Sequence, residues 1–135
     1  MSRIAVVAFG GNALVTDAEH DGIPDQYETV SRTVPPLLDL VEQGWGLVVS
    51  HGNGPQVGFI LRRSEIAQSE VDPVPVDYAV ADTQGAIGYM FVKALRNEMT
   101  RRGIRPLRWM SRALMPSVAS SSRVTTPDEP NARSG

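Results

Sequence analysis

The chain has 135 residues, 41% of them hydrophobic, which suits one hydrophobic core and is too short for two substantial domains. Its formal net charge of −2 at pH 7 gives no electrostatic reason to expect nucleic acid or an anionic membrane as a partner. The lack of cysteine excludes disulfides, thiolate zinc sites and cysteine nucleophiles, and without a secretory signal or an apolar run near ~20 residues we expect a cytoplasmic protein.

A strand and a glycine turn open the chain. The apolar run Ile4–Phe9 predicts a strand of a parallel sheet that is buried on both faces. Gly10, Gly11 and Asn12 follow this strand directly. Residues 16–26 are polar and contain an Asp-Gly pair and a proline, which predicts a loop.

Residues 27–43 carry apolar side chains at helical spacing. Pro35 and Pro36 lie in the middle of this segment. Each proline removes an N–H donor and crowds the preceding turn, so we expect a break or kink there. Gly44 fits the left-handed position that follows a helix end.

A second strand and a second glycine turn follow. Residues 47–50 predict the strand, so that residues 4–50 form one βαβ unit. Residues 51–58, with the sequence HGNGPQVG, separate this strand from a helical segment over residues 57–68. A strand, a glycine loop and a helix favour anion binding, because the backbone approaches closely and the helix start presents unpaired N–H groups. Two such turns at one end of a parallel sheet are expected to face a common crevice.

A long third helix is predicted over residues 79–102, with Gly103 as its stop. The prolines between residues 71 and 76 exclude a helix before it. Its broad apolar face is expected to cross the sheet or to meet a partner chain. The segment QGAIGY at residues 84–89 is expected to be packing, with small residues that allow close approach to the sheet or to a second subunit.

The composition changes at Ile104. Residues 104–135 are rich in Ser, Thr and Pro, and their net charge is opposite in sign to that of residues 1–103. Such a segment buries too little apolar surface to offset the entropy of ordering it. We therefore expect an α/β region over residues 1–103 and a divergent, disordered tail over residues 104–135.

Three motifs give the chain a specific resemblance. Residues 8–14 (AFGGNAL), 51–58 (HGNGPQVG) and 82–89 (DTQGAIGY), in this order, resemble carbamate kinase of the amino acid kinase superfamily. HGNGPQVG is highly specific, GGNAL is shared more widely across the superfamily, and QGxIGY again points to carbamate kinase. The resemblance covers residues 3–103, roughly the first third of a family member, and the family's continuation beyond Gly103 is absent.

The resemblance implies a three-layer αβα sandwich with a mostly parallel sheet, of which this chain has the N-terminal part. Family members phosphorylate carbamate reversibly with ATP, giving carbamoyl phosphate and ADP, and usually run towards ATP in arginine catabolism. They act with Mg²⁺ and as homodimers, and here the helix over residues 79–102 could supply the dimer contact. Nucleotide binding belongs mainly to the family's C-terminal half, which we expect to be missing from this chain.

The resemblance also assigns site residues. Gly10, Gly11 and Asn12 correspond to the turn that holds the transferred phosphoryl group in the family. Gly52, Asn53 and Gly54 correspond to the turn that faces carbamate and the same phosphoryl group. Backbone N–H groups suit phosphoryl transfer because they neutralise spread negative charge without reorganising. No residue matches a catalytic lysine of the family, since the only lysine is Lys93 within the third helix. The acidic residues show no metal-ligand spacing.

Alternatives remain open beside these assignments. His51 could act as a general base, although a histidine at a strand end more often orients a loop. Asn12 and Asn53 could simply satisfy their turns. The chain could be the acceptor-binding half of a carbamate kinase, or a non-catalytic truncated product or small-anion-binding module that acts only with a partner. Neither a Walker A motif nor GxGxxG is present, which argues against P-loop and dinucleotide-binding classes.

Overall fold

The computed structural model describes residues 3–15 and 19–104, and the predicted tail beyond Ile104 lies outside them. The elements follow in the order β1 (Ile4–Phe9), the 3₁₀ turn η1 (Gly11–Leu14), α1 (Ile23–Glu42), β2 (Gly46–His51), α2 (Gly54–Ala67) and α3 (Val76–Arg101). β1 and β2 pair in parallel, with Phe9 opposite His51. The predicted βαβ unit is therefore confirmed. Among the described residues, no helix combines the length and apolarity that crossing a membrane requires.

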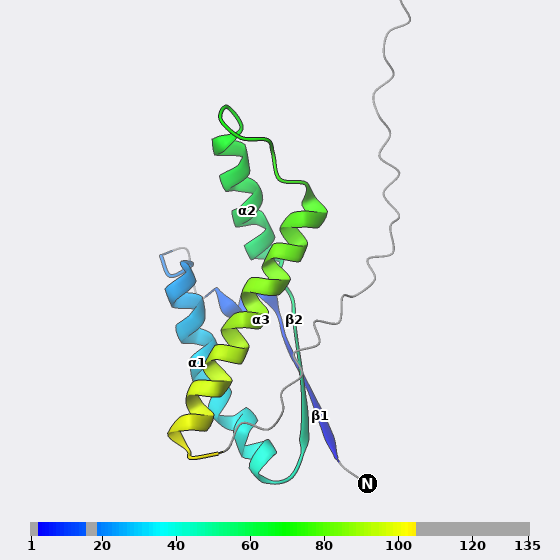
Figure 1. The fold of residues 1–135 in the computed structure, drawn as a ribbon, viewed down its shortest axis with the longest axis vertical. Helices are drawn as coiled ribbons and strands as arrows, with labels where there is room; N and C mark the ends of the chain where they lie inside the picture. The colour runs from blue at the N-terminus through cyan, green and yellow to red at the C-terminus, as the bar shows by residue number, and fades with distance from the viewer. Residues whose placement is uncertain (1–2, 16–18, 105–135) are drawn as a thin grey trace, which may run out of the picture.

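Helices α1 and α3 lie side by side over one face of the two-stranded sheet (Figure 1). The core between them consists of side chains from η1, α1 and α3, namely Leu14, Val30, Val34, Leu38, Ile87, Met90, Phe91, Ala94, Leu95 and Met99. The sheet joins this core through Phe9 and Val49. The rings of Phe9 and Phe91 lie 4.9 Å apart between centroids, a contact that contributes about 0.5–1.5 kcal/mol beyond its buried area.

The opposite face of the sheet is open, so the prediction that Ile4–Phe9 is buried on both faces is wrong for the described chain. Ile4 and Val6 are 62% and 70% exposed, and Val48 beside them is 47% exposed. The alternate residues, such as Val7, are half-buried against the helices. Apolar residues on both faces of a strand indicate that both can be covered, but they do not supply the covering layer. The described residues thus form the sheet and one helical layer of the three-layer fold.

Helix α1 is continuous, so the predicted break at Pro35 and Pro36 is wrong, and the helix begins at Ile23 inside the predicted loop. Pro24 lies in the first turn, where no N–H donor is needed. The two interior prolines remove two helical hydrogen bonds. The cost is offset because Val34, directly before them, is fully buried and the whole face packs on α3.

The predicted helix ends are confirmed at both glycines. Gly44 follows α1 with a φ of 84°, and Gly103 follows α3 with a φ of 67°. The N–H of Gly44 donates to the Val41 carbonyl, and that of Gly103 donates to the Thr100 carbonyl. Ile104 packs against the core, so the body of the fold extends one residue past Gly103.

Arg102 joins the C-terminal ends of α1 and α3. Its guanidinium group donates to Asp39 at 2.6 Å, to Glu42 at 2.6 Å and to Glu98 at 2.8 Å. It also donates to the carbonyl of Pro35 at 3.0 Å. Asp39 and Glu42 are about half exposed, so each single pair contributes little in water. The four acceptors together fix the crossing of the two helices.

Glu98 makes the stability of this crossing dependent on pH. Hydrogen bonds from Arg101 and then Arg102 lower the pKa of Glu98 from 4.5 to about 2. A carboxyl with a lowered pKa in the folded state stabilises the fold above its unfolded pKa, and this contribution is lost as pH falls towards the folded pKa.

We therefore expect the urea midpoint of the chain to fall between about pH 5 and pH 2 by more than that of the Glu98→Gln variant. The matched control is Glu65→Gln, because Glu65 forms an exposed pair with Arg62 on α2. Equal acid sensitivity of the wild-type chain and Glu98→Gln would contradict this account. Urea unfolding monitored by circular dichroism at several pH values gives the measurement.

Candidate functional site

The two glycine turns meet at the carboxyl ends of β1 and β2. Because Phe9 lies opposite His51 in the parallel pair, both strands end at the same level. The N–H of Gly52 donates to the Phe9 carbonyl at 2.7 Å. η1 begins at Gly11 and α2 begins at Gly54, so one helical turn starts directly behind each strand. The two glycine turns therefore lie side by side at the carboxyl ends of the strands, as expected.

Contact between the turns requires glycine at two positions. A Cβ atom on Gly52 would lie 2.8 Å from the backbone nitrogen of Gly11. A Cβ atom on Gly11 would lie 3.0 Å from the backbone nitrogens of both Asn53 and Gly54. Neither glycine has a positive φ, so the constraint is the space between two backbones. Gly10 and Gly54 have no atom within 4 Å of such a Cβ and border open space.

Several backbone N–H groups at this edge have no acceptor in the part of the chain that the structure describes. In the second turn, Val57 donates to the Asn53 carbonyl, whereas the N–H of Gly54 at the start of α2 is unpaired. In the first turn, Ala13 donates to Gly10, whereas the N–H groups of Gly11 and Asn12 are unpaired. Unpaired N–H groups at helix starts carry partial positive charge. The arrangement can therefore bind an anion.

The two asparagines differ in what their side chains do. The Asn53 amide donates to the Thr83 hydroxyl at 2.8 Å, and Thr83 donates to the Val80 carbonyl at 2.8 Å. Thr83 is only 2% exposed, so this bond ties the second turn to α3 inside the protein. Asn12 is exposed. Asn12 can therefore offer a side-chain amide to a ligand, whereas Asn53 offers its backbone.

A second anchor runs from α2 to η1 and α1. The Gln56 amide nitrogen lies 3.4 Å from the Gly11 carbonyl and donates to Gln26 Oε1 at 3.2 Å. Gln26 donates in turn to the Asp21 carbonyl at 2.7 Å. Both glutamines are buried. The Gly11 turn is thus contacted by the Gln56 amide, which Gln26 holds in place.

His51 is oriented towards its own loop. Its Nδ1 lies 3.2 Å from the Gly52 carbonyl, and its ring stacks near Phe91 with centroids 6.4 Å apart. This geometry favours the loop-orienting interpretation over a general base, because the ring nitrogen nearest the turn is already engaged.

Other sequence candidates lie away from the turns. The ammonium group of Lys93 lies 4.3 Å from the centroid of the Tyr27 ring. Gly85 and Gly88 have no atom within 4 Å of an added Cβ, so these small residues do not bring α3 close to the sheet. Their role in contact with a second subunit stays a prediction. Within residues 3–15 and 19–104, no three His, Asp or Glu side chains form a cluster that could hold a metal ion.

Three residues of the site were missed or misplaced by sequence reasoning. Thr83 carries no motif signal beyond its place in a segment of family resemblance, and Gln26 was assigned to a loop. Gln56 belongs to HGNGPQVG but its partners are not visible in the sequence. Polar residues at otherwise apolar helical positions were the available signal, since Gln26 and Thr83 lie one turn before Val30 and Ile87.

The described residues form an α/β fold with two contacting glycine turns at the ends of parallel strands, as the resemblance to the amino acid kinases implies. No protein-family model matches the chain. Among curated proteins, it is 41% identical over 105 residues to the carbamate kinase-like protein YahI of Escherichia coli, covering 76% of this chain and 33% of the relative. It is 47% identical over 94 residues to the carbamate kinase of Halobacterium salinarum, covering 70% of this chain and 30% of the relative.

Solved structures agree. Carbamate kinase from Giardia lamblia bound to AMP-PNP matches with a TM-score of 0.71 and 29% identity, covering 76% of this chain and 36% of that chain. A protein from Aeropyrum pernix matches with a TM-score of 0.70 and 36% identity, covering 78% and 34%. The chain is therefore a homologue of the carbamate kinases over about three quarters of its length, and it spans about a third of the length of the curated relatives it matches.

The hydrogen bond between Asn53 and Thr83 gives a testable energetic prediction. Thr83→Val keeps the side-chain shape and leaves the Asn53 amide without its acceptor, which costs about 1–3 kcal/mol of unfolding free energy. In a double-mutant cycle with Asn53→Ala, we expect a coupling energy of about 1 kcal/mol. Urea unfolding of the four chains measures it.

Thr100→Val is the matched control. Thr100 lies on the same helix and donates to the Arg96 carbonyl at 2.9 Å, so the variant removes only a bond within the helix. A loss in Thr83→Val no larger than in Thr100→Val would show that the second turn is not anchored through this bond.

Proposed function

We propose that this chain provides the phosphoryl- and acceptor-binding part of a carbamate kinase, which transfers a phosphoryl group reversibly between ATP and carbamate. The observation that carries this proposal is the contact of the two glycine turns at Gly11 and Gly52, in a chain homologous to carbamate kinases. The setting that follows is a cytoplasmic one, with the reaction running towards ATP in arginine catabolism.

The proposed roles follow from the chemistry of phosphoryl transfer. A carbamate oxygen forms a bond to the γ-phosphorus while the bond from that phosphorus to the ADP oxygen breaks, and the reverse reaction returns the group to ADP. Negative charge is spread over the three remaining phosphoryl oxygens in the transition state. The turn formed by Gly10, Gly11 and Asn12 would hold this group through backbone N–H and the Asn12 amide. Gly52, Asn53 and Gly54 would face carbamate and the same group through their backbones.

The described residues fit the phosphate end of a nucleotide better than they fit a metal ion. The relative from Giardia lamblia was solved with AMP-PNP, and the unpaired N–H groups of the two turns suit the phosphate end of ATP or ADP. Mg²⁺ prefers clustered carboxylate oxygens, and among the described residues no group of three such side chains is arranged so that it could hold a metal ion. We therefore assign no step through Mg²⁺ to these residues.

A homodimer through α3 belongs to the same proposal. Tyr78 and Tyr89 on this helix are 66% and 65% exposed. Large exposed aromatic side chains are enriched at protein interfaces. The glycines between them, Gly85 and Gly88, leave room for a second helix.

Binding of an anion at the turns can be tested directly by a heteronuclear NMR titration. We expect phosphate or carbamoyl phosphate to shift the amide signals of Gly10, Gly11, Asn12, Gly52, Asn53 and Gly54 selectively. Gly11→Val should abolish these shifts, because its side chain would meet two backbone nitrogens at 3.0 Å and force the turns apart. Gly58→Val is the control, since Gly58 lies in the same motif with open space around it. Shifts confined to other regions would refute the site.

Turnover is expected to need more than this chain. Its only lysine packs over Tyr27, and cationic groups on a transferring phosphoryl group are worth about 10³–10⁵ in rate. We expect the chain alone to form no ATP from ADP and carbamoyl phosphate above background. Mixing it with the complementary two thirds of the carbamate kinase of Halobacterium salinarum should give turnover, and Gly11→Val should remove that turnover.

Turnover by the isolated chain near the rate of the mixture would contradict this expectation. A second function, a small-anion-binding module that acts only with a partner, is supported by the unpaired N–H groups of the two turns. Selective anion binding at the turns, without turnover in any mixture, would assign the chain to that function.

A further inference from the structure

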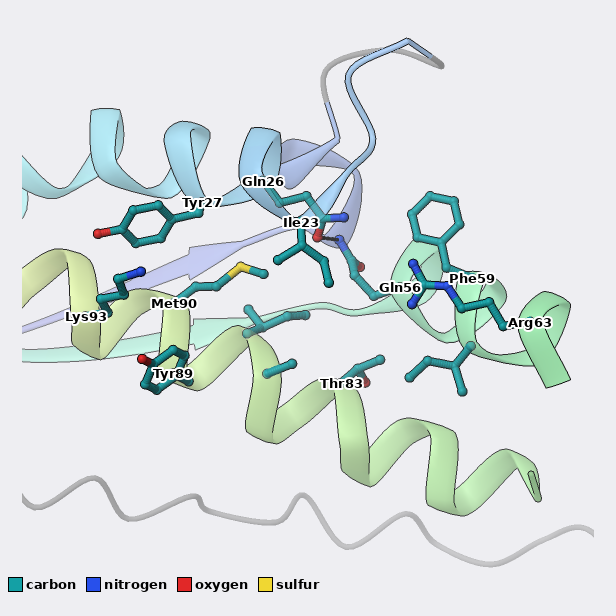
Figure 2. Close-up of a pocket in the computed structure, with 13 residues that line it drawn as sticks. Ile23, Gln26, Tyr27, Gln56, Phe59, Arg63, Thr83, Tyr89, Met90 and Lys93 are labelled. Atoms are coloured by element: carbon teal, nitrogen blue, oxygen red, sulfur yellow. Dashed lines mark hydrogen bonds between the residues drawn. The ribbon is translucent and has the colours of Figure 1, made fainter. Parts of the chain in front are cut away.

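A separate cavity of about 230 Å³ lies between α1, α2 and α3 (Figure 2). Most of its lining is apolar and comes from all three helices, including Ile23, Phe59, Ile60, Ile87 and Met90. None of the glycine-turn residues lines it. The cavity is therefore distinct from the proposed phosphoryl site, although Gln56 and Thr83 in its lining also anchor the turns.

Two cationic side chains border this cavity. Arg63 lies on the side of Phe59 and Gln56, whereas Lys93 lies on the side of Tyr27 (Figure 2). Neither forms an ion pair within the described residues. The lining contains no Asp or Glu. A concave apolar surface that is bordered by positively charged side chains raises the local concentration of anions.

Gln56, one of the lining residues, carries a buried acceptor without a donor. Gln56 is 7% exposed, and its Oε1 is the one buried side-chain oxygen or nitrogen in the described residues that has no hydrogen-bond partner. Its orientation is fixed: Gln26 donates to the Asp21 carbonyl, so Gln26 Oε1 must receive the Gln56 amide nitrogen. The opposite orientation would set Gln56 Oε1 against two other oxygens. Because buried polar groups are normally hydrogen-bonded, this oxygen is expected to accept a hydrogen bond from a bound molecule.

We propose that this cavity binds a small organic anion with an apolar body and a hydroxyl or amide N–H donor, such as a branched 2-hydroxy carboxylate. The donor would satisfy Gln56 Oε1, the apolar body would lie against Ile87 and Met90, and the carboxylate would face Arg63 or Lys93 at one end of the cavity. A free amino acid fits less well, because its ammonium group would enter the field of Arg63 and Lys93. The site goes beyond the proposed phosphoryl transfer and does not depend on it.

The test is an NMR titration of the full chain with 2-hydroxy-4-methylpentanoate. We expect shifts at Ile60, Ile87 and Met90. Affinity should fall about fivefold for 4-methylpentanoate, which lacks the hydroxyl donor. Binding should be lost for 2-hydroxy-4-methylpentanamide, which keeps the hydroxyl and lacks the charge. These ligand controls use the unaltered chain, so they do not depend on the folding of a variant.

Variants of the two cationic residues test whether ligand binding depends on their charge. Arg63→Met together with Lys93→Met should raise the Kd by about tenfold or more. Arg96→Met is the matched control, an exposed cation one turn further along α3 and outside the lining, and should change the Kd by less than about twofold.

Three results of the ligand and variant titrations would overturn the proposal. They are an absence of shifts at the cavity at millimolar ligand, equal affinity for the neutral amide, and an equal loss of affinity in Arg96→Met. A concentration-dependent shift of Ile60 and Ile87 without ligand would also overturn it, because it would show that a second copy covers the cavity. Phosphate titrations report on Gly10, Gly11 and Asn12 instead, so this site and the proposed function can fail separately.

Discussion

The contact between the two glycine turns is the constraint on which the rest of the structure depends. A Cβ atom on Gly52 would lie 2.8 Å from the backbone nitrogen of Gly11, so the two main chains touch with no side chain between them. This contact follows from the parallel register that ends Phe9 and His51 at one level. A site made of backbone N–H groups is only as accurate as the fold that positions it.

Two hydrogen-bonded anchors supply that accuracy. Thr83 on α3 holds Asn53 of the second turn, and Gln56 on α2 reaches the carbonyl of Gly11 in the first. Of the helices that carry these anchors, α3 lies beside α1, and α2 extends beyond the carboxyl ends of the strands and packs on α3 (Figure 1). Arg102 fixes the crossing of α1 and α3, so it supports the position of Thr83 through the rigidity of α3 and not by contact.

The sequence predicted those features that depend on residues close together in the chain. The strands, the glycine turns and the left-handed positions at Gly44 and Gly103 follow from residue type and spacing alone. The prolines of α1 were misread, because the cost of two missing hydrogen bonds is local whereas the burial of Val34 against α3 depends on a helix far along the chain. The anchors escaped prediction for the same reason, since Asn53 and its partner Thr83 are 30 residues apart.

The two glycine turns carry less positive charge than a transferring phosphoryl group requires. A helix start carries about half a positive charge, whereas a transferring phosphoryl group carries more than one negative charge spread over three oxygens. The two turns can therefore orient this group and neutralise part of its charge, but not all of it. The one lysine of the chain lies over the Tyr27 ring, and Arg63 borders a separate cavity. The geometry of the described residues thus provides positioning, and the compensating charge must come from groups that the turns do not contain.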